Sequence, residues 1–148
     1  MHILMCNDDG ILADGLRHLA SYLSQYYRIT VVAPANEQSA KSHALTTEIP
    51  LKLDAYNGED ENPRLYALTG TPSDCMKFGL SYLLTDDMPD LVISGINHGF
   101  NLGSDVLYSG TVSAAMESCF YGIPGLALSV ERYSPERGDE MHPFIHEL

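Results

Sequence analysis

The chain has 148 residues, of which 45% are hydrophobic and 19% are charged, as in an ordinary globular domain that buries a substantial core. Twenty Asp and Glu residues against eight Lys and Arg give a formal net charge of −12. This balance argues against duplex nucleic acid and anionic membranes as partners, because both bind basic surfaces, and the three widely spaced cysteines form no CxxC pair that would indicate a disulfide framework or a zinc ribbon.

The first half of the chain is predicted to combine strands with one helix. The predicted strands lie at 2–7, 28–33, 43–55 with an interruption at Pro50, and 64–69. A helix over 14–27 is predicted from four apolar residues at helical spacing, Leu16, Leu19, Ala20 and Leu23. A polar loop over 36–42 and an acidic turn over 57–63 connect these elements.

The second half continues the alternation with two helices and two buried strands. Thr71 is expected to cap the first helix, with Pro72 and Asp74 in its first turn, and this helix is expected to end near Leu84. A strand over 90–94, a Gly- and Asn-rich loop over 95–110, a helix over 111–121 and a strand over 125–130 follow. The pattern predicts an α/β fold, a three-layer α/β/α Rossmann-like domain with a mostly parallel sheet over 1–131, and an irregular tail over 132–148.

Two adjacent carboxylates, Asp8 and Asp9, stand directly after the first predicted strand and before Gly10. Open α/β sheets bind ligands at the carboxyl ends of their strands. Two neighbouring carboxylates repel each other, so a bound cation would favour both in the ionised form, and oxygen donors favour a hard divalent metal. An Asx-type turn that caps the next helix explains this segment equally well on its own.

Three further polar loops are expected at the same edge of the sheet, at 36–39, 94–105 and 108–111. In the last of them, Ser109, Gly110 and Thr111 precede a predicted helix, whose free N–H groups would suit a phosphate. Simple capping of the helix by Ser or Thr is the commoner use of such residues and remains an alternative. Of the six histidines, only His98 is expected near this site, as a supporting residue.

Six segments in the same order along the chain carry a family resemblance. They are Asn-Asp-Asp-Gly at 7–10, Val-Val-Ala-Pro at 31–34, and the segments 38–46, 70–75, 94–99 and 101–117. Together they resemble the SurE family of survival-protein phosphatases, which are metal-dependent nucleotidases. The resemblance implies a SurE-like Rossmann fold and a 5′-nucleotidase that hydrolyses nucleoside monophosphates, with 3′-nucleotides and short polyphosphate as further candidate substrates.

The resemblance also assigns roles to individual residues. The family's metal ligands fall on Asp8, Asp9, Ser39 and Asn97, which are all oxygen donors. Its phosphate contacts fall on Ser109, Gly110 and Thr111, with Asn101 close by. The implied cofactor is one divalent metal ion per subunit, Mg²⁺ or Mn²⁺. Asp8 or Asp9 is expected to accept a proton from the attacking water, and the residues leave open which of the two does so.

Three more expectations follow from the sequence. Free cysteines and the lack of a signal peptide or long apolar run predict a soluble, cytoplasmic protein. Because family members usually extend well beyond the strand at 125–130, the family's carboxyl-terminal region is expected to be absent. The exposed strand edge predicts a homo-oligomer, a dimer or tetramer.

The alternative function is a truncated, weak or silent nucleotide- and metal-binding module that acts through self-association. Ala40 stands where glycine is expected in many relatives, and it fits only if its backbone avoids a positive φ.

Overall fold

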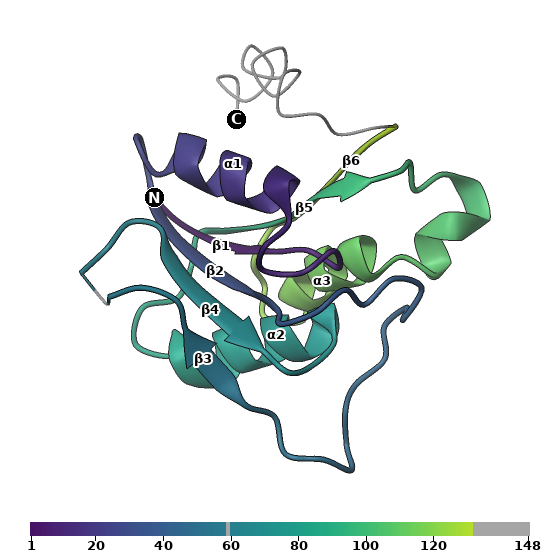
Figure 1. The fold of residues 1–148 in the computed structure, drawn as a ribbon, viewed down its shortest axis with the longest axis horizontal. Helices are drawn as coiled ribbons and strands as arrows, with labels where there is room; N and C mark the ends of the chain where they lie inside the picture. Colours follow the sequence, from purple (N-terminus) through teal and green to yellow (C-terminus); the bar gives the residue numbers. More distant parts are fainter. Residues whose placement is uncertain (59, 132–148) are drawn as a thin grey trace.

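The computed structural model describes residues 1–58 and 60–131, in which strands and helices alternate (Figure 1). The strands are β1 (His2–Cys6), β2 (Arg28–Pro34), β3 (Leu53–Ala55), β4 (Arg64–Leu68), β5 (Leu91–His98) and β6 (Gly125–Val130). The helices are α1 (Asp14–Leu23), α2 (Pro72–Phe78) with a π-helical continuation over Gly79–Leu83, a 3₁₀ helix over Gly103–Leu107, and α3 (Gly110–Cys119). The tail predicted over 132–148 lies outside the described residues, so the predicted domain limits stay a prediction.

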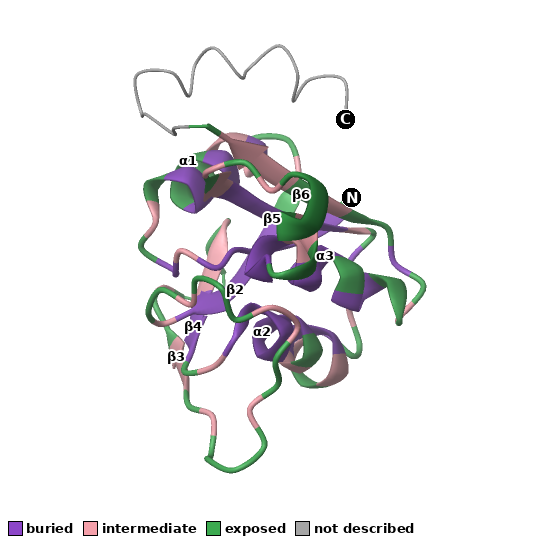
Figure 2. Ribbon diagram, turned by 90° about the vertical axis from the view of Figure 1, so that its right-hand side faces the viewer, coloured by how far each residue is buried: buried purple, intermediate pink, exposed green. Residues whose placement is uncertain are grey.

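The strands form one six-stranded sheet in the order β3-β4-β2-β1-β5-β6. Every neighbouring pair is parallel except β3 and β4, which are antiparallel. Helix α1 covers one face, and α2 and α3 cover the other (Figures 1 and 2). The predicted α/β fold with a mostly parallel sheet is therefore confirmed. The strand order reverses at β1: β2, β3 and β4 lie on one side of it, and β5 and β6 lie on the other.

Each face of the sheet contributes alternate strand residues to a separate core, because side chains of a strand point to opposite faces in turn. Toward α1, Ile3, Met5 and Val31 pack with Leu16 and Leu19. Toward α2 and α3 the core is formed by buried side chains that include Leu4, Val32, Leu68, Met76, Leu80 and Ala114. In both cores β1 is buried along its whole length, so the residues that follow it are anchored firmly.

Two predicted strands differ from the structure. In the segment 43–55 only Leu53–Ala55 is a strand, because α2 takes the polar groups that would otherwise pair with a neighbouring strand: Asp74 accepts from the Thr46 backbone N–H at 3.0 Å, and the Ala44 carbonyl accepts from Thr71 Oγ1 at 2.6 Å. The strand predicted over 90–94 continues to His98, because β6 pairs with it beyond an irregularity between Ser94 and Asn97.

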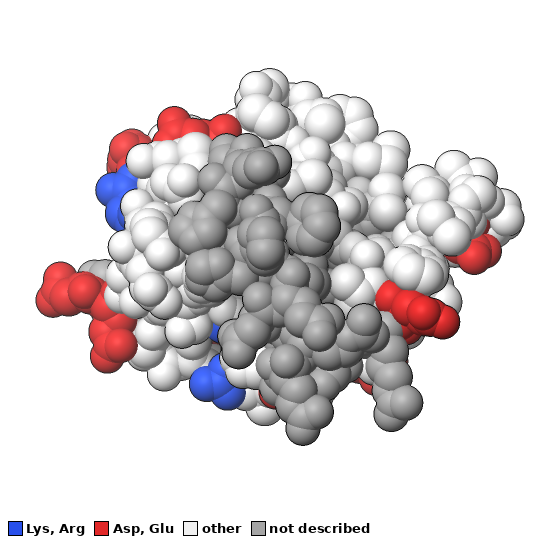
Figure 3. All heavy atoms as spheres, turned by 90° about the horizontal axis from the view of Figure 1, so that it is seen from above, with Lys and Arg blue, Asp and Glu red and all other residues white. Residues whose placement is uncertain are grey.

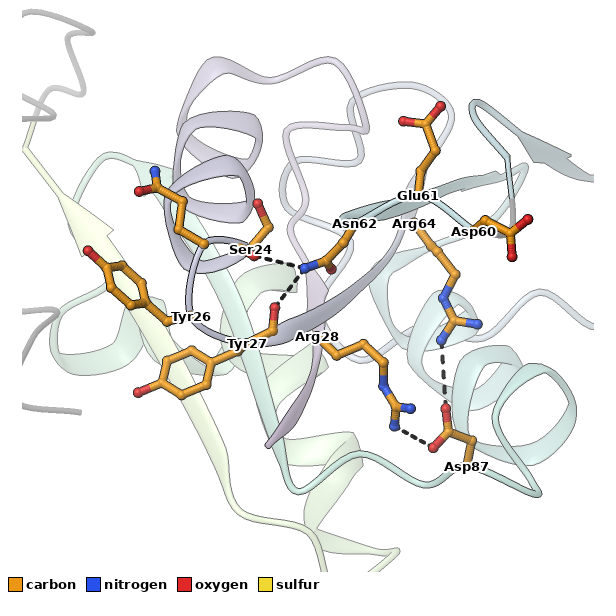
Figure 4. A pocket seen from close by; sticks show the side chains of 10 residues that line it. Ser24, Tyr26, Tyr27, Arg28, Asp60, Glu61, Asn62, Arg64 and Asp87 are labelled. Atoms are coloured by element: carbon orange, nitrogen blue, oxygen red, sulfur yellow. Dashed lines mark hydrogen bonds and ion pairs between the residues drawn. The ribbon is translucent and has the colours of Figure 1, made fainter.

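The first helix is also shorter than predicted and ends at Leu23. The next residues turn into β2, and the turn is held by Asn62, whose Nδ2 donates to the carbonyls of Ser24 and Tyr27 at 2.8 Å each (Figure 4). The helix start at Thr71 is as predicted, since Thr71 and Asp74 form a capping box and Pro72 occupies the first turn. In the part of the chain that the structure covers, no helix has the length and apolarity needed to cross a bilayer.

Candidate active site

A cavity of about 330 Å³ opens at the carboxyl ends of β1 and β5, and most of the predicted site residues line it. The predicted residues in its wall are Asp8, Asp9, Ser39, Asn97, Asn101 and Ser109, and His98 is beside them. The volume lies within the range of small-molecule sites in proteins. Three loops that are far apart in the sequence thus meet here, as expected for a parallel sheet whose strand ends share one edge.

The loop after β1 is shaped by Asn7, which the structure identifies as the turn-forming residue. Its buried side chain donates from Nδ2 to the Gly10 carbonyl at 3.0 Å and accepts from the Gly10 N–H at 3.1 Å. Gly10 has a φ of 101°, which a residue with a β-carbon rarely adopts. The next helix is preceded by Ala13, without a side-chain cap. Asp8 and Asp9 are therefore not helix caps, and both carboxylates are available to the cavity.

Asp8 is buried against the start of α3. Thr111 donates from Oγ1 to Asp8 Oδ1 at 2.7 Å, and both side chains are buried. Gly110 permits this approach, since a β-carbon there would lie 2.8 Å from Asp8 Cβ and 3.0 Å from Pro72 Cγ. Thr111 and Gly110, predicted as phosphate contacts, thus lie directly behind Asp8. The Thr111 hydroxyl holds that carboxylate, a contact between residues 103 positions apart that the sequence did not indicate.

Asp9 lies in an environment that disfavours its ionised form. Burial is the main cause of its raised pKa, and the neighbouring Asp8 carboxylate is the second; a hydrogen bond from the His98 backbone opposes them. Glu37 adds further negative charge nearby. A divalent cation between the two carboxylates would relieve this repulsion, so the charge of the site fits a metal ion.

Ser39 and Asn97 supply the other oxygen atoms of the candidate donor set. Ser39 Oγ donates to Glu37 Oε1 at 2.6 Å. Asn97 Nδ2 donates to the Gly99 carbonyl at 2.7 Å, so the other amide atom, Oδ1, is the one that can bind a cation. Within residues 1–58 and 60–131, no three His, Cys, Asp or Glu side chains are grouped as metal ligands. Two carboxylates with a hydroxyl and a carboxamide are instead an all-oxygen set, which suits Mg²⁺ or Mn²⁺.

Ser109 and Asn101 hold the rim of the cavity to the rest of the fold. Ser109 is the N-cap of α3, because its Oγ accepts from the Val112 N–H at 3.2 Å. The structure thus shows the helix capping that the sequence offered as the alternative to phosphate binding. Ser109 nevertheless lines the cavity, and its hydroxyl hydrogen can still be donated to a ligand. Asn101 donates from Nδ2 to Ser129 Oγ of β6 at 2.8 Å.

The loop that carries Ser39 adopts left-handed backbone conformations at Ala40 and Ser42, with φ of 57° and 53°. The expectation that Ala40 would avoid a positive φ is therefore wrong. A left-handed residue with a β-carbon costs roughly 1–2 kcal/mol. Contacts with the 3₁₀ helix offset this cost, since Ser42 donates from Oγ to the Leu107 carbonyl at 2.8 Å and from its backbone N–H to the Tyr108 carbonyl at 3.2 Å.

A hydrogen bond between His43 and Glu117 joins the same loop to α3. His43 Nε2 lies 2.7 Å from Glu117 Oε2, and the Glu117 side chain is only 7% exposed, whereas that of His43 is 31% exposed. The residues are 74 positions apart, so no local pattern in the sequence predicts the pair. It links the segment that bears Ser39 to the helix whose start contacts Asp8.

Replacing His43 by Leu should lower the free energy of unfolding by about 1–3 kcal/mol, because the Glu117 carboxylate would remain buried without its partner. Glu117→Met should cost less in the His43→Leu background than in the parent, which a double-mutant cycle in urea would measure. Lys52→Met is the matched control, since Lys52 and its partner Asp54 are 72% and 47% exposed. Additive effects of the His43 and Glu117 substitutions would show that the contact has no energetic role.

A second cavity lies at the other end of the strands, where Arg28 and Arg64 both pair with Asp87 (Figure 4). Asp60 and Glu61 line this cavity as well, but its two arginines supply positive charge beside the carboxylates. No Lys or Arg is among the described residues that line the cavity of Asp8 and Asp9. On the face seen in Figure 3, acidic side chains lie toward both ends and basic ones are few, in line with the net charge of −12. Within this acidic molecule, the cavity at β1 and β5 is the stronger candidate for chemistry.

Comparisons with protein families, curated proteins and solved structures each find similar proteins. The family described as "Survival protein SurE" matches residues 3–148. Among curated relatives, "5′-nucleotidase SurE" of Thermoanaerobacter sp. (strain X514) is 49% identical over 148 residues, which is 100% of this chain and 58% of the relative. The protein of the same name from Thermosipho africanus (strain TCF52B) is 52% identical over 132 residues, or 87% of this chain and 50% of the relative.

Among solved structures, the SurE protein from Aquifex aeolicus matches with a TM-score of 0.83 and 38% identity, over 99% of this chain and 59% of that one. The described fold is thus shared with a known structure along nearly the whole chain. The chain spans between half and three fifths of the length of these relatives.

Proposed function

Because the chain belongs to the SurE family, we propose that it forms the catalytic core of a divalent-metal-dependent phosphatase acting on nucleoside monophosphates. The products are a nucleoside and inorganic phosphate, as for a 5′-nucleotidase, the name that the curated relatives carry. The observation that carries the proposal is the meeting of Asp8, Asp9, Ser39 and Asn97 in one cavity beside the start of α3. This arrangement combines a cation site with N–H and hydroxyl donors for a phosphate.

The residues divide the proposed chemistry between them. Asp8, Asp9, Ser39 and Asn97 would hold one Mg²⁺ or Mn²⁺ ion, which when bound supplies Lewis-acid activation and a water of lowered pKa. Asp9 is the better proton acceptor of the two carboxylates, since Asp8 already accepts a hydrogen bond from the Thr111 hydroxyl. Ser109 and the free N–H groups at the start of α3 would bind the phosphoryl oxygens and stabilise the charge that develops on them.

The direct test is phosphate release from AMP, GMP, CMP and UMP, measured with Mg²⁺, with Mn²⁺ and with EDTA. We expect release with a metal and none with EDTA, and 3′-AMP and tripolyphosphate in the same assay would define the range of substrates. Release that is equal in EDTA would contradict the metal-dependent mechanism. Metal and AMP binding without turnover would instead favour the alternative of a silent binding module.

We propose further that copies of the chain associate. Among the described residues, strand β6 is at the edge of the sheet and is half-exposed along most of its length, so on that side it has backbone groups that no described strand pairs with. Size-exclusion chromatography with light scattering should therefore give a mass of two or four chains, and a monomer at tens of micromolar would contradict the proposal.

The cytoplasm remains the proposed location. Cys6, Cys75 and Cys119 are free thiols, and Cys6 and Cys75 are buried. Burial raises the pKa of Cys75 well above its usual value, and the adjacent Cys6 raises it further, so this thiol stays protonated and unreactive. Free thiols are typical of proteins in a reducing compartment.

A further inference from the structure

We infer that His2 forms a pH-sensitive switch at the amino-terminal ends of the strands, the end opposite to the candidate active site. The switch is a chain of hydrogen bonds from Arg64 through Thr30 to His2, and the chain is complete only while the His2 ring is neutral. Uptake of a proton by this ring weakens the attachment of the segment 84–90 to β1. The inference goes beyond the proposed phosphatase function, because none of these residues lines the candidate active site.

The His2 ring is buried and has a partner at each of its two nitrogen atoms. Its side chain is only 3% exposed. Nδ1 lies 3.1 Å from the backbone carbonyl oxygen of Asp87, and Nε2 lies 2.9 Å from Thr30 Oγ1 of the neighbouring strand β2. A carbonyl oxygen can only accept, so Nδ1 is the nitrogen that carries the hydrogen. In the neutral ring Nε2 is then an acceptor, and it accepts from the Thr30 hydroxyl.

Arg64 of β4 fixes the direction of the hydrogen bond between Thr30 and His2. Arg64 Nη2 donates to Thr30 Oγ1 at 2.9 Å, and a guanidinium has no acceptor to offer in return. The Thr30 oxygen therefore accepts from Arg64 while its hydrogen is donated to His2. A protonated ring would direct a second cationic donor at the same oxygen, and the hydroxyl hydrogen would lose its acceptor. Because Thr30 is fully buried, water does not replace that acceptor, so the chain favours the neutral ring.

Charged groups from β2, β4 and the segment 84–90 surround the ring. Arg28 and Arg64 are positive, and both pair with the Asp87 carboxylate, which lies 3.6 Å from His2 Nδ1 (Figure 4). Burial, the largest effect, and the charge of Arg28 lower the pKa of His2, whereas Asp87 opposes them and Arg64 lowers the pKa further. The single carboxylate is shared by two guanidinium groups, so it compensates only part of the cost of a third positive charge.

The ring of His2 belongs to a larger set of contacts that hold the segment 84–90 against β1. The His2 backbone N–H donates to Asp90 Oδ2 at 2.7 Å, and the Asp90 N–H donates to the His2 carbonyl at 2.8 Å. The ring adds the hydrogen bond to the Asp87 carbonyl. Because folding lowers the pKa of His2 from its ordinary value of 6.5, the stabilisation by the neutral ring is complete above that pH and is lost as the pH falls below it.

The experiment measures urea unfolding of the full chain in EDTA, from about pH 7.5 to about pH 5. The unfolding constant of the parent should rise with falling pH more steeply than that of His2→Gln, and the difference should stay below about tenfold per pH unit, the limit for uptake of one proton. Gln does not titrate and can both donate and accept. His18→Gln is the matched control, since His18 is an exposed histidine of α1 and its replacement should leave the parental pH dependence unchanged.

Two NMR measurements test the inference in the parent itself, even if His2→Gln does not fold. The ring nitrogen shifts of His2 should show the Nδ1–H tautomer, and the ring should titrate at a lower pH than that of His18. The protection factor of the Asp90 amide against hydrogen exchange should fall between about pH 7.5 and about pH 5.5.

Equal pH dependence of unfolding in the parent and His2→Gln would overturn the inference. A hydrogen on Nε2 of the neutral ring, a titration of His2 at or above that of His18, or an Asp90 protection factor that is unchanged by pH would do the same. None of these measurements uses phosphate release, so their outcome is separate from that of the test of the proposed function.

Discussion

Replacing Asp8 by Asn is expected to lower metal-dependent turnover by about a thousandfold or more while the fold survives. The substitution keeps the volume of the side chain and an oxygen that can accept the hydrogen bond from Thr111, but it removes one of the two negative charges at the cavity. Metal affinity, measured by calorimetry with Mn²⁺, should fall together with kcat. The metal-free protein should unfold in urea at the same concentration or a higher one, because the repulsion between Asp8 and Asp9 is relieved.

Asp14→Asn provides the control for this experiment. Asp14 is an exposed acid in the first turn of α1, so its replacement changes the net charge by the same amount without altering the cavity. Turnover and metal affinity of this variant should match those of the parent. Metal-dependent hydrolysis by Asp8→Asn at the parental rate would rule out Asp8 as a metal ligand.

Replacing Thr111 by Val is expected to weaken metal binding by about ten- to a hundredfold, because groups that orient metal ligands through hydrogen bonds have effects of this size. The Thr111 hydroxyl donates to Asp8 Oδ1 at 2.7 Å in a buried environment, and Val keeps the shape of the side chain without the donor. The turnover number should fall by a similar factor, because Asp8 would no longer be held in place by the Thr111 hydroxyl.

Thr111→Ser is the control that separates the hydroxyl from the β-branch. It retains the donor, so metal affinity should stay within a few-fold of that of the parent. The N-cap of α3 is Ser109, so a defect in Thr111→Val cannot be assigned to a lost helix cap. If Thr111→Val bound Mn²⁺ and hydrolysed AMP as the parent does, the contact with Asp8 would have no role in the site.

The parts of the fold that could be predicted from the sequence are those with local signals. The start of α2 has its signal in four consecutive residues, from Thr71 to Asp74, and the helix begins there with Thr71 as its N-cap, as predicted. The apolar run of β1 likewise predicts a strand buried on both faces. The convergence of Asp8 and Asn97 on one cavity was predictable too, because parallel strands end at a common edge.

What the sequence did not indicate depends on contacts between distant residues. Strands were predicted in 43–55 from alternating hydropathy, but the pairing of Thr46 with Asp74, 28 positions away, replaces most of that pattern with a fixed irregular loop. The same holds for His43 with Glu117 and for Thr111 with Asp8, which are 74 and 103 positions apart. The Thr111 hydroxyl contacts the candidate ligand Asp8, and the other two pairs attach the loop that follows Ser39. These supporting contacts were therefore the harder part of the site to predict.

The attachment of the Ser39 loop to Asp74 has a consequence for how this sequence can change over evolution. Asp74 caps its own helix and also binds Thr46, and Ser42 donates to the Leu107 and Tyr108 carbonyls, so the number of residues between Ser42 and Thr46 is constrained at both ends. Residues 47–50, by contrast, are exposed and lie beyond these attachments. Insertions and deletions should therefore accumulate at 47–50 and be absent from 42–46, and this asymmetry would appear as a difference in length variation within one continuous loop.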